Sequence, residues 1–235
     1  MDLQLKEGEV HIWSAALGRP AMLARLLTQL ADDERERAER LRVREDFARF
    51  VVSRALLRTI LGRYLDVEPR ELRFSTTPNG KPVLANPYEN ALMFNLSRSR
   101  ELVLYAIASD AEVGIDVERE GQDLEVDQLA ERFFSPAEAA SIRRLSASEK
   151  STAFLTYWVC KEAYIKATGE GLSRPLNSFE VSFTGNPVLI DSEASAQESC
   201  RWSLHRIRGL AGHIAAFVAD KNCSQFRQRE WLEPV

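Results

Sequence analysis

The 235 residues of this chain, 45% of them hydrophobic, can bury a sizeable core as one large domain or two small ones. The formal net charge of −4 gives no general attraction to a polyanion, so we expect no nucleic-acid partner. No apolar run approaches the roughly 20 residues of a membrane helix, and the start, MDLQLKEGEV, lacks a secretory signal pattern. We therefore expect a cytoplasmic protein with no membrane span.

The cysteines and histidines are few and scattered. Cys160, Cys200 and Cys223 are odd in number and form no Cys-x-x-Cys pair, so we expect reduced, buried thiols rather than disulfides or a zinc site. The three histidines show no His-x-x-x-His spacing, and the chain has no Gly-x-Ser-x-Gly elbow. These absences argue against zinc hydrolysis and serine-triad chemistry.

Elements predicted in the first part of the chain recur in the same order in the second part. The matched pairs are strands 10–15 and 113–118, helices 46–63 and 148–168, strand-turn segments 71–84 and 178–190, and strands 102–108 and 213–219. This repetition predicts an α+β fold made of two similar halves, 1–112 and 113–235, related by pseudo-twofold symmetry. Because no linker-like segment separates them, we expect them to pack as one body with a ligand cleft between them.

Arginines are dense between residues 34 and 58, at positions 35, 37, 40, 42, 44, 49, 54 and 58. Interleaved glutamates favour a solvated helix face for most of them. One or two arginines turned inward would suit a phosphate group.

The helix predicted over 148–168 carries two charges among its apolar residues. A Ser-x-x-Glu capping box at Ser146 begins it and Gly169 ends it. Glu162 and Lys166 fall on the side that carries the apolar residues Leu155, Trp158, Val159 and Ile165. One interpretation is a surface ion pair between Glu162 and Lys166; the other is that a buried partner, metal or ligand compensates their desolvation.

The strand VGIDVE, residues 113–118, points two carboxylates to one face. Asp116 and Glu118 are two positions apart, while the valines and the isoleucine take the other face. The simpler interpretation is the solvent side of an edge strand. If Glu162 approaches this pair, however, each carboxylate contact repels by about 4 kcal/mol at an effective dielectric near 20. A divalent cation resolves that repulsion, and oxygen ligands suit Mg²⁺ shared with substrate phosphates.

Phosphates also need cationic and backbone donors. The candidates are Lys166, Lys81 in the PNGKP turn, Ser97 and Arg98 in FNLSRS, and the backbone of Gly169-x-Gly171. Each has a structural alternative: a turn lysine, a plain loop, or a helix stop.

Several of these segments together resemble the signature of the 4′-phosphopantetheinyl transferases. GIDVE and WVCKEAYIKATGEGL match the paired motifs of that family, and NGKP, FNLSRS and RFFSPAE follow its order and spacing. The length and the internal repeat are similar to the surfactin-type, two-half, monomeric branch rather than to the half-length, trimeric synthases.

The resemblance implies an activity and a set of site residues. It implies transfer of the phosphopantetheine arm of coenzyme A to a serine of an apo carrier protein, acyl or peptidyl, with release of 3′,5′-ADP. Asp116, Glu118 and Glu162 would then hold Mg²⁺, Glu162 would also help to take the serine proton, and Lys166 would neutralise the leaving phosphate. The implied coenzyme A contacts are Lys81, Ser97, Arg98 and Lys166, with Arg49 and Arg37 near the adenosine 3′-phosphate.

Three neighbouring residues need separate interpretations. Arg98 replaces the family's usual histidine; arginine keeps a positive donor but cannot serve a role that needs a titrating imidazole. Lys161 receives no chemical role, and we expect it to pair with a neighbouring acid. In RFFSPAE, Ser135 predicts a helix cap with Glu138, and Phe133 and Phe134 predict core positions. The alternative is that one phenylalanine, with Arg132, Arg143 or Arg144, faces a carrier helix.

Two rival functions remain open at this point. One is a different Mg²⁺-dependent phosphoryl or nucleotidyl transfer, since three acids and a lysine specify charge better than substrate. The other is a non-catalytic module that binds coenzyme A or a carrier protein without turnover.

Overall fold

The computed structural model describes residues 3–18, 23–183, 188–190, 201–223 and 225–232. Its helices are α1 (Leu23–Leu27), α2 (Asp32–Glu39), α3 (Arg44–Leu65), α4 (Val126–Phe133), α5 (Pro136–Arg143) and α6 (Ala147–Thr168). Three short 3₁₀ helices are η2 (Pro69–Glu71), η3 (Gly171–Ser173) and η4 (Leu176–Ser178). The strands are β1 (Glu9–Ala16), β2 (Phe74–Thr76), β3 (Pro82–Leu84), β4 (Met93–Ser99), β5 (Leu102–Ala108), β6 (Val113–Arg119), β7 (Glu180–Ser182), β8 (Val188–Ile190), β9 (Trp202–Ile207), β10 (His213–Asp220) and β11 (Gln225–Glu230).

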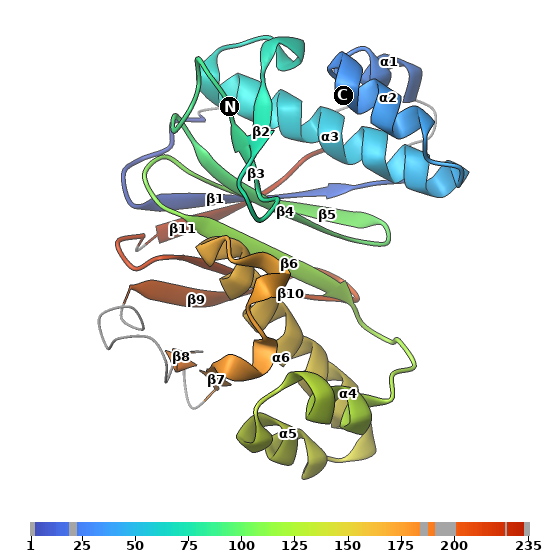
Figure 1. Cartoon of the computed structure of the whole chain (residues 1–235), viewed down its shortest axis with the longest axis vertical. Coiled ribbons are helices and arrows are strands. Elements are labelled where there is room, and N and C mark those ends of the chain that lie inside the picture. The colour runs from blue at the N-terminus through green and yellow to red at the C-terminus, as the bar shows by residue number, and fades with distance from the viewer. Residues whose placement is uncertain (1–2, 19–22, 184–187, 191–200, 224, 233–235) are drawn as a thin grey trace.

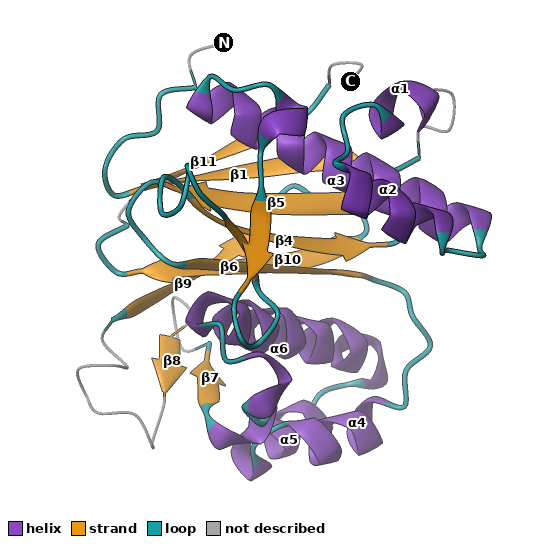
Figure 2. Ribbon diagram, turned by 45° about the horizontal axis from the view of Figure 1, so that its top comes forward, coloured by secondary structure: helices purple, strands orange, loops and turns teal. Residues whose placement is uncertain are grey.

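Two sheets form the centre of the molecule, and helices cover their outer faces (Figures 1 and 2). One sheet has the strand order β11-β1-β5-β4 and the other the order β6-β10-β9, while β2-β3 and β7-β8 form small separate hairpins. Apolar side chains from both large sheets, among them Ile12, Ala106, Ile115 and Phe217, fill the space between them. Further clusters bury the outer faces under α3 and under α6. The mixed α+β fold predicted from the sequence is confirmed.

The predicted repetition appears in the pairing of the strands. β1 pairs antiparallel with β5, and Ala16 lies opposite Leu102. β6 pairs antiparallel with β10 in the same register, so that Arg119 lies opposite His213. Helices α3 and α6 both contain 22 residues. The C-terminal strand β11 crosses back and pairs in parallel with β1, which the repeat did not predict.

Helix α6 begins and ends where its sequence signals predicted. The side chain of Glu149 accepts the backbone N–H of Ser146 to close the capping box, and Gly169 ends the helix in the left-handed region at φ 72°. A side chain at that φ would be strained, so glycine is the natural stop. The first-half helix α3 is longer than its predicted range of 46–63: it ends at Leu65, and Asp66 caps it in the left-handed region.

Strands β4 and β6 lie side by side, and short polar side chains join them (Figure 1). On β4, Asn95 Oδ1 accepts the backbone N–H of Ile115 at 3.0 Å, and Ser99 Oγ accepts that of Arg119 at 2.9 Å. Ser97 Oγ accepts the N–H of residue 117 between them, at 3.4 Å. The two sheets therefore meet along a row of side-chain hydrogen bonds, where the FNLSRS segment is a strand and not a loop.

Cys160 and Cys223 are free and buried, as expected, and burial raises the pKa of the Cys160 thiol to about 12. Cys200 lies outside the described residues. Across the described ranges, no helix combines the length and the apolar character that a membrane crossing requires.

Candidate active site

A glycine in β6 lets helix α6, which carries the candidate residues Glu162 and Lys166, lie directly on the strand. A Cβ atom at Gly114 would come within 2.1 Å of the Ala163 carbonyl oxygen and 2.3 Å of the Ala167 nitrogen. Both atoms belong to the helix backbone, which cannot move aside as a flexible side chain can. Gly114 is therefore required for the approach that brings the polar face of α6 over Asp116.

Lys166, Asp116 and Ser97 form a hydrogen-bonded trio where β4, β6 and α6 meet. Lys166 Nζ donates to Asp116 Oδ1 at 2.6 Å and also lies 3.3 Å from Ser97 Oγ. Ser97 Oγ in turn donates to Asp116 Oδ1 at 2.7 Å. The Asp116 side chain is only 6% exposed, whereas the Lys166 side chain is 28% exposed. The ion pair is thus buried on the acid side and open on the lysine side.

Glu118 and Glu162 experience the charge of Asp116. Burial first, and then the charges of Asp116 and Glu162, raise the pKa of Glu118, while a hydrogen bond from Ser99 and the charge of Lys166 act against that rise. Burial and the charge of Asp116 likewise raise the pKa of Glu162. The charges of these carboxylates from β6 and α6 therefore oppose one another, and the Asp116 side chain contacts Lys166 of α6 rather than solvent.

The donor set suits Mg²⁺, although the carboxylates are not gathered around one point. Asp116 Oδ2 is buried and has no hydrogen-bond partner in the structure, which leaves one oxygen free for a cation. Within the ranges described, no three histidine, cysteine, aspartate or glutamate side chains form a group able to hold a metal ion. The three carboxylates fit Mg²⁺ because oxygen ligands suit this ion and because Asp116 Oδ2 has no partner. The other oxygen of Asp116, Oδ1, contacts the ammonium of Lys166.

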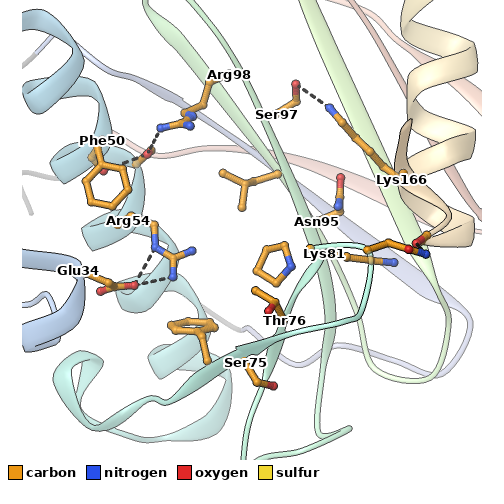
Figure 3. A pocket seen from close by; sticks show the side chains of 18 of the residues that line it. Glu34, Phe50, Arg54, Ser75, Thr76, Lys81, Asn95, Ser97, Arg98 and Lys166 are labelled. Carbon is orange, nitrogen blue, oxygen red and sulfur yellow. Dashed lines mark hydrogen bonds and ion pairs between the residues drawn. The ribbon is translucent and has the colours of Figure 1, made fainter. Parts of the chain in front are cut away.

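A pocket of about 760 Å³ opens beside this trio, between α3, the β2-β3 hairpin, β4 and the end of α6 (Figure 3). The NGK turn closes one side of it. Asn79 Nδ2 donates to the Gly169 carbonyl oxygen at 2.9 Å, and Lys81 Nζ donates to Glu112 at 2.6 Å and to the Ala167 carbonyl oxygen at 3.2 Å. Lys81 therefore lines the pocket and also anchors the hairpin to α6.

The predicted coenzyme A contacts divide into those that line the pocket and one that does not. Ser97, Arg98, Lys166 and Arg37 line it together with Lys81. Arg98 donates to Ser53 Oγ of α3 at 3.2 Å. Arg49 does not line the pocket: it pairs on α3 with Glu45 at 3.5 Å and with Asp46 at 3.6 Å.

Lys161 pairs with an acid, as expected. Its Nζ lies 2.8 Å from Glu138 Oε2, and neither side chain is more than 4% exposed. Glu138 also accepts the backbone N–H of Ser135, which closes the predicted cap of α5, and that of Val181 on β7. Lys161 additionally donates to the carbonyl oxygens of residues 176 and 179. The RFFSPAE and WVCKEAYIK motifs therefore meet in one buried ion pair.

The two phenylalanines of RFFSPAE differ in burial. Phe134 is 2% exposed and its ring lies 5.0 Å from that of Phe154, so its predicted core position is confirmed. Phe133 is half-buried and packs edge-on against Trp158 at 5.5 Å. Phe133 is thus the member of the pair that retains an accessible face.

Sequence reasoning missed several residues of this site. Asn95 and Ser99 were not predicted, although they alternate with Ser97 on the strand that joins the sheets. Glu34 and Arg54 line the pocket and were not singled out. A signal for Arg54 was present, because the stretch FVVSRALLRTIL places arginines inside an apolar helix, as in the helix that carries Glu162 and Lys166.

Comparisons with known proteins identify the family. A family model described as the 4′-phosphopantetheinyl transferase superfamily matches residues 112–218, and one described as 4′-phosphopantetheinyl transferase, N-terminal, matches residues 13–111. The 4′-phosphopantetheinyl transferase HetI of Nostoc sp. is 38% identical over 224 residues, which cover 94% of this chain and 88% of that protein. The 4′-phosphopantetheinyl transferase Sfp of Bacillus subtilis is 34% identical over 157 residues, 67% of this chain and 68% of that protein. The resemblance seen in the motifs is confirmed, and the chain belongs to the Sfp-type branch of the 4′-phosphopantetheinyl transferase superfamily.

Proposed function

We propose that this transferase moves the 4′-phosphopantetheine arm of coenzyme A to a serine of an apo acyl or peptidyl carrier protein, in a Mg²⁺-dependent reaction. The observation that carries the proposal is the trio of Lys166, Asp116 and Ser97 at one end of the pocket. A partly exposed ammonium beside a buried carboxylate suits a substrate pyrophosphate that binds in the pocket.

The chemistry divides among three kinds of group. The serine oxygen forms a bond to the β-phosphorus of coenzyme A, and the bond from that phosphorus to the bridging oxygen breaks, which releases 3′,5′-ADP. Glu162 is the candidate acceptor for the serine proton, because burial and the charge of Asp116 raise the pKa of its carboxyl group and so make the carboxylate a stronger base. Lys166 is suited to offset the charge that develops on the leaving phosphate.

Asp116, Glu118 and Glu162 are the residues that would hold Mg²⁺. The bound ion would supply positive charge to the pyrophosphate oxygens, which are its usual ligands together with carboxylates. Asp116 Oδ2 supports this assignment, since a buried carboxylate oxygen without a partner is costly.

Coenzyme A itself is assigned to the pocket. Lys81 and Lys166 are assigned to the pyrophosphate end, Arg98 to the nucleotide end, and Ser97 lies between them (Figure 3). Arg37 also lines the pocket, with its guanidinium over the Phe50 ring at 5.3 Å. Arg98 suits a phosphate oxygen in place of the family histidine because it stays protonated. Arg49 would reach the nucleotide only by leaving Glu45 and Asp46.

The test is the mass of an apo carrier protein after incubation with the enzyme, coenzyme A and Mg²⁺. We expect the carrier to gain the mass of one phosphopantetheine, and we expect Glu162→Gln and Asp116→Ala to remove the gain while the thermal unfolding midpoint stays near that of the wild type. Carriers from fatty-acid, polyketide and peptide synthetases should be assayed in parallel. Carriers of all three types that remain unmodified would contradict the proposal, even where coenzyme A binds.

We also propose that the protein acts as a monomer in the cytoplasm, because one chain supplies both repeated halves to the site. Light scattering after size exclusion measures the mass directly. A dimer or trimer mass in the active fraction would reject the monomer.

A further inference from the structure

Two serines of β4 stand beside the two acids of β6, and each serine donates to one acid. Ser97 Oγ donates to Asp116 Oδ1 at 2.7 Å, and Ser99 Oγ donates to Glu118 Oε2 at 3.3 Å. Both serines are buried. Because residues two apart on a strand point to the same face, the Ser-x-Ser spacing of β4 matches the Asp-x-Glu spacing of β6. Each carboxylate therefore has a hydroxyl partner of its own.

The backbone of β6 holds each of these hydroxyl groups in place. Ser97 Oγ accepts the N–H of Val117 at 3.4 Å, and Ser99 Oγ accepts that of Arg119 at 2.9 Å. These two residues directly follow the two acids. A hydroxyl group has one hydrogen and two lone pairs, so accepting the N–H leaves the hydrogen available for the carboxylate. The same two-way contact is thus repeated at both acids.

Asn95, two positions before Ser97 on β4, shows that an acceptor alone is sufficient to join the strands. Asn95 Oδ1 accepts the N–H of Ile115 at 3.0 Å. The residue before Ile115 is Gly114, which offers no side chain to bind. The hydroxyl groups of β4 stand at the two positions where β6 offers a carboxylate. Their hydrogens therefore serve the acids and not the joint between the strands.

Ser97 uses its whole hydrogen-bonding capacity inside the protein, although it lines the pocket. Its hydrogen goes to Asp116, and its lone pairs take the N–H of residue 117 and the ammonium of Lys166 at 3.3 Å (Figure 3). Ser97 and Lys166 both contact Oδ1 of Asp116. Oδ2 is the oxygen that has no partner among the described residues. The two contacts to Oδ1 therefore decide which oxygen of Asp116 is left for a cation.

A carboxylate that binds a metal ion is usually held by a hydrogen bond from a neighbouring group, and loss of that partner weakens metal binding by about tenfold to a hundredfold. A hydroxyl donor also favours the charged form of the carboxylate, which is the form that binds a cation. We propose that Ser97 and Ser99 are positioning residues of the metal site, and that each orients one acid of β6 toward the metal ion. The inference rests on the proposed Mg²⁺-dependent function, and it gives Ser97 a role through Asp116.

The test measures metal affinity and needs no carrier protein. Mn²⁺ replaces Mg²⁺, because electron paramagnetic resonance separates free from bound Mn²⁺. Each protein is titrated with saturating coenzyme A present, and the Mn²⁺ that coenzyme A binds by itself is subtracted. We expect Ser97→Ala to raise the Kd for Mn²⁺ by about tenfold. Ser99→Ala should raise it by about threefold, because its bond to Glu118 is longer and weaker.

Asn95→Ala is the matched control, since it removes an acceptor from the same joint at a place beside Gly114 rather than beside an acid. It should leave the Kd for Mn²⁺ within about twofold of the wild type. Ser97→Thr and Ser99→Thr keep the hydroxyl group and should recover most of the affinity that the alanine variants lose. Unfolding midpoints identify any variant that fails to fold.

Three results would overturn the inference. In the first, the serine-to-alanine variants bind Mn²⁺ as the wild type does. In the second, Asn95→Ala loses as much affinity as they do, which would mean that the joint between the strands and not the hydroxyl hydrogen matters. In the third, folded threonine variants bind Mn²⁺ as weakly as the alanine variants.

Turnover gives an independent measurement. With an accepted carrier, the Mg²⁺ concentration that gives half of the maximal rate should rise in each alanine variant by the same factor as the Kd for Mn²⁺. A loss of rate that does not depend on the Mg²⁺ concentration would contradict the inference. An enzyme that modifies no carrier, yet binds Mn²⁺ through these serines, would reject the proposed function and keep this inference. An enzyme that modifies carriers, with a Mn²⁺ affinity independent of both serines, would do the reverse.

Discussion

Helix α3 packs on β1 beside His11, whereas helix α6 packs on β6 at Gly114, and these two positions correspond in the repeated strand pairing. The two strand pairs have the same register: His11 lies opposite Ile107 of β5, and Gly114 lies opposite Val218 of β10. His11 Nδ1 is 2.5 Å from the Tyr64 hydroxyl of α3, so a polar side chain stands between helix and strand. At Gly114 nothing stands between them, and the helix backbone touches the strand.

The difference shows how one repeated unit forms the proposed active site while the corresponding place in the other unit is filled by packed side chains. Close contact at Gly114 sets Lys166 on Asp116 at 2.6 Å. In the first part of the chain the Tyr64 hydroxyl instead accepts the indole N–H of Trp13 at 3.0 Å, and the space is filled by aromatic rings. The contrast therefore depends on the size of the side chain at a single strand position.

The strongest way to break this comparison is Gly114→Ala. The new methyl group would meet two backbone atoms of α6 well inside contact distance, so the helix must move away from the strand. We expect the free energy of unfolding to fall by about 3 kcal/mol and transfer to be lost. Urea denaturation and the carrier mass assay measure the two effects. Gly18→Ala is the control, since a Cβ there meets no atom within 4 Å, and equal behaviour of the two variants would contradict the close-contact explanation.

Lys166 can be compared with the residue at its own position in the other long helix, Arg63 of α3. Lys166 contacts Asp116, while the guanidinium of Arg63 lies over the ring of Trp231 at 4.4 Å. We expect Lys166→Ala to lower kcat by about a hundredfold, because it removes positive charge at the leaving phosphate, and Arg63→Ala to leave kcat unchanged. Steady-state kinetics with saturating coenzyme A measure kcat for both variants. An equal loss of kcat in the two variants would contradict a specific role for Lys166.

The smallest effect concerns the pH dependence that His11 gives to the first-half core. Burial first, and then the charge of Arg229, lower the pKa of His11 despite the opposing charge of Glu9. The unfolded chain then binds the proton more readily, so the contribution of neutral His11 is complete above about pH 6.5 and is lost as pH falls toward the lower folded pKa. We expect His11→Gln, which can still hydrogen-bond Tyr64, to lose less stability than the wild type between pH 7.5 and 5.5 in urea titrations. A parallel loss in both would contradict the assignment.

Local sequence signals predicted α6, its caps, the shared face of Asp116 and Glu118, and the acid partner of Lys161, because each depends on residues close in sequence or on a simple period. The row of hydrogen bonds from β4 could not be predicted in that way. Asn95 and Ser99 find partners on β6 only after two separate sheets are packed.

The arginines of α3 show the same limit. Arg49 and Arg54 are both arginines on one helix, and only the position of α2 and β2 decides which of them enters the pocket. The internal repeat held the missing information, because the counterpart of Arg54 is a tyrosine and the counterpart of Arg58 is a lysine. Comparing the two long helices position by position would have distinguished Arg58, which binds Glu34 and two carbonyl oxygens inside the protein, from Arg54, which lines the pocket.

The row of short polar side chains on β4 has a consequence for self-association. β6 is the outer strand of its sheet, and its outward amides at Ile115 and Arg119 are occupied by Asn95 and Ser99 rather than by another strand's backbone. A free strand edge invites a second molecule to add to the sheet. By blocking that edge with side chains, the protein brings its two sheets together without leaving this edge as a template for aggregation.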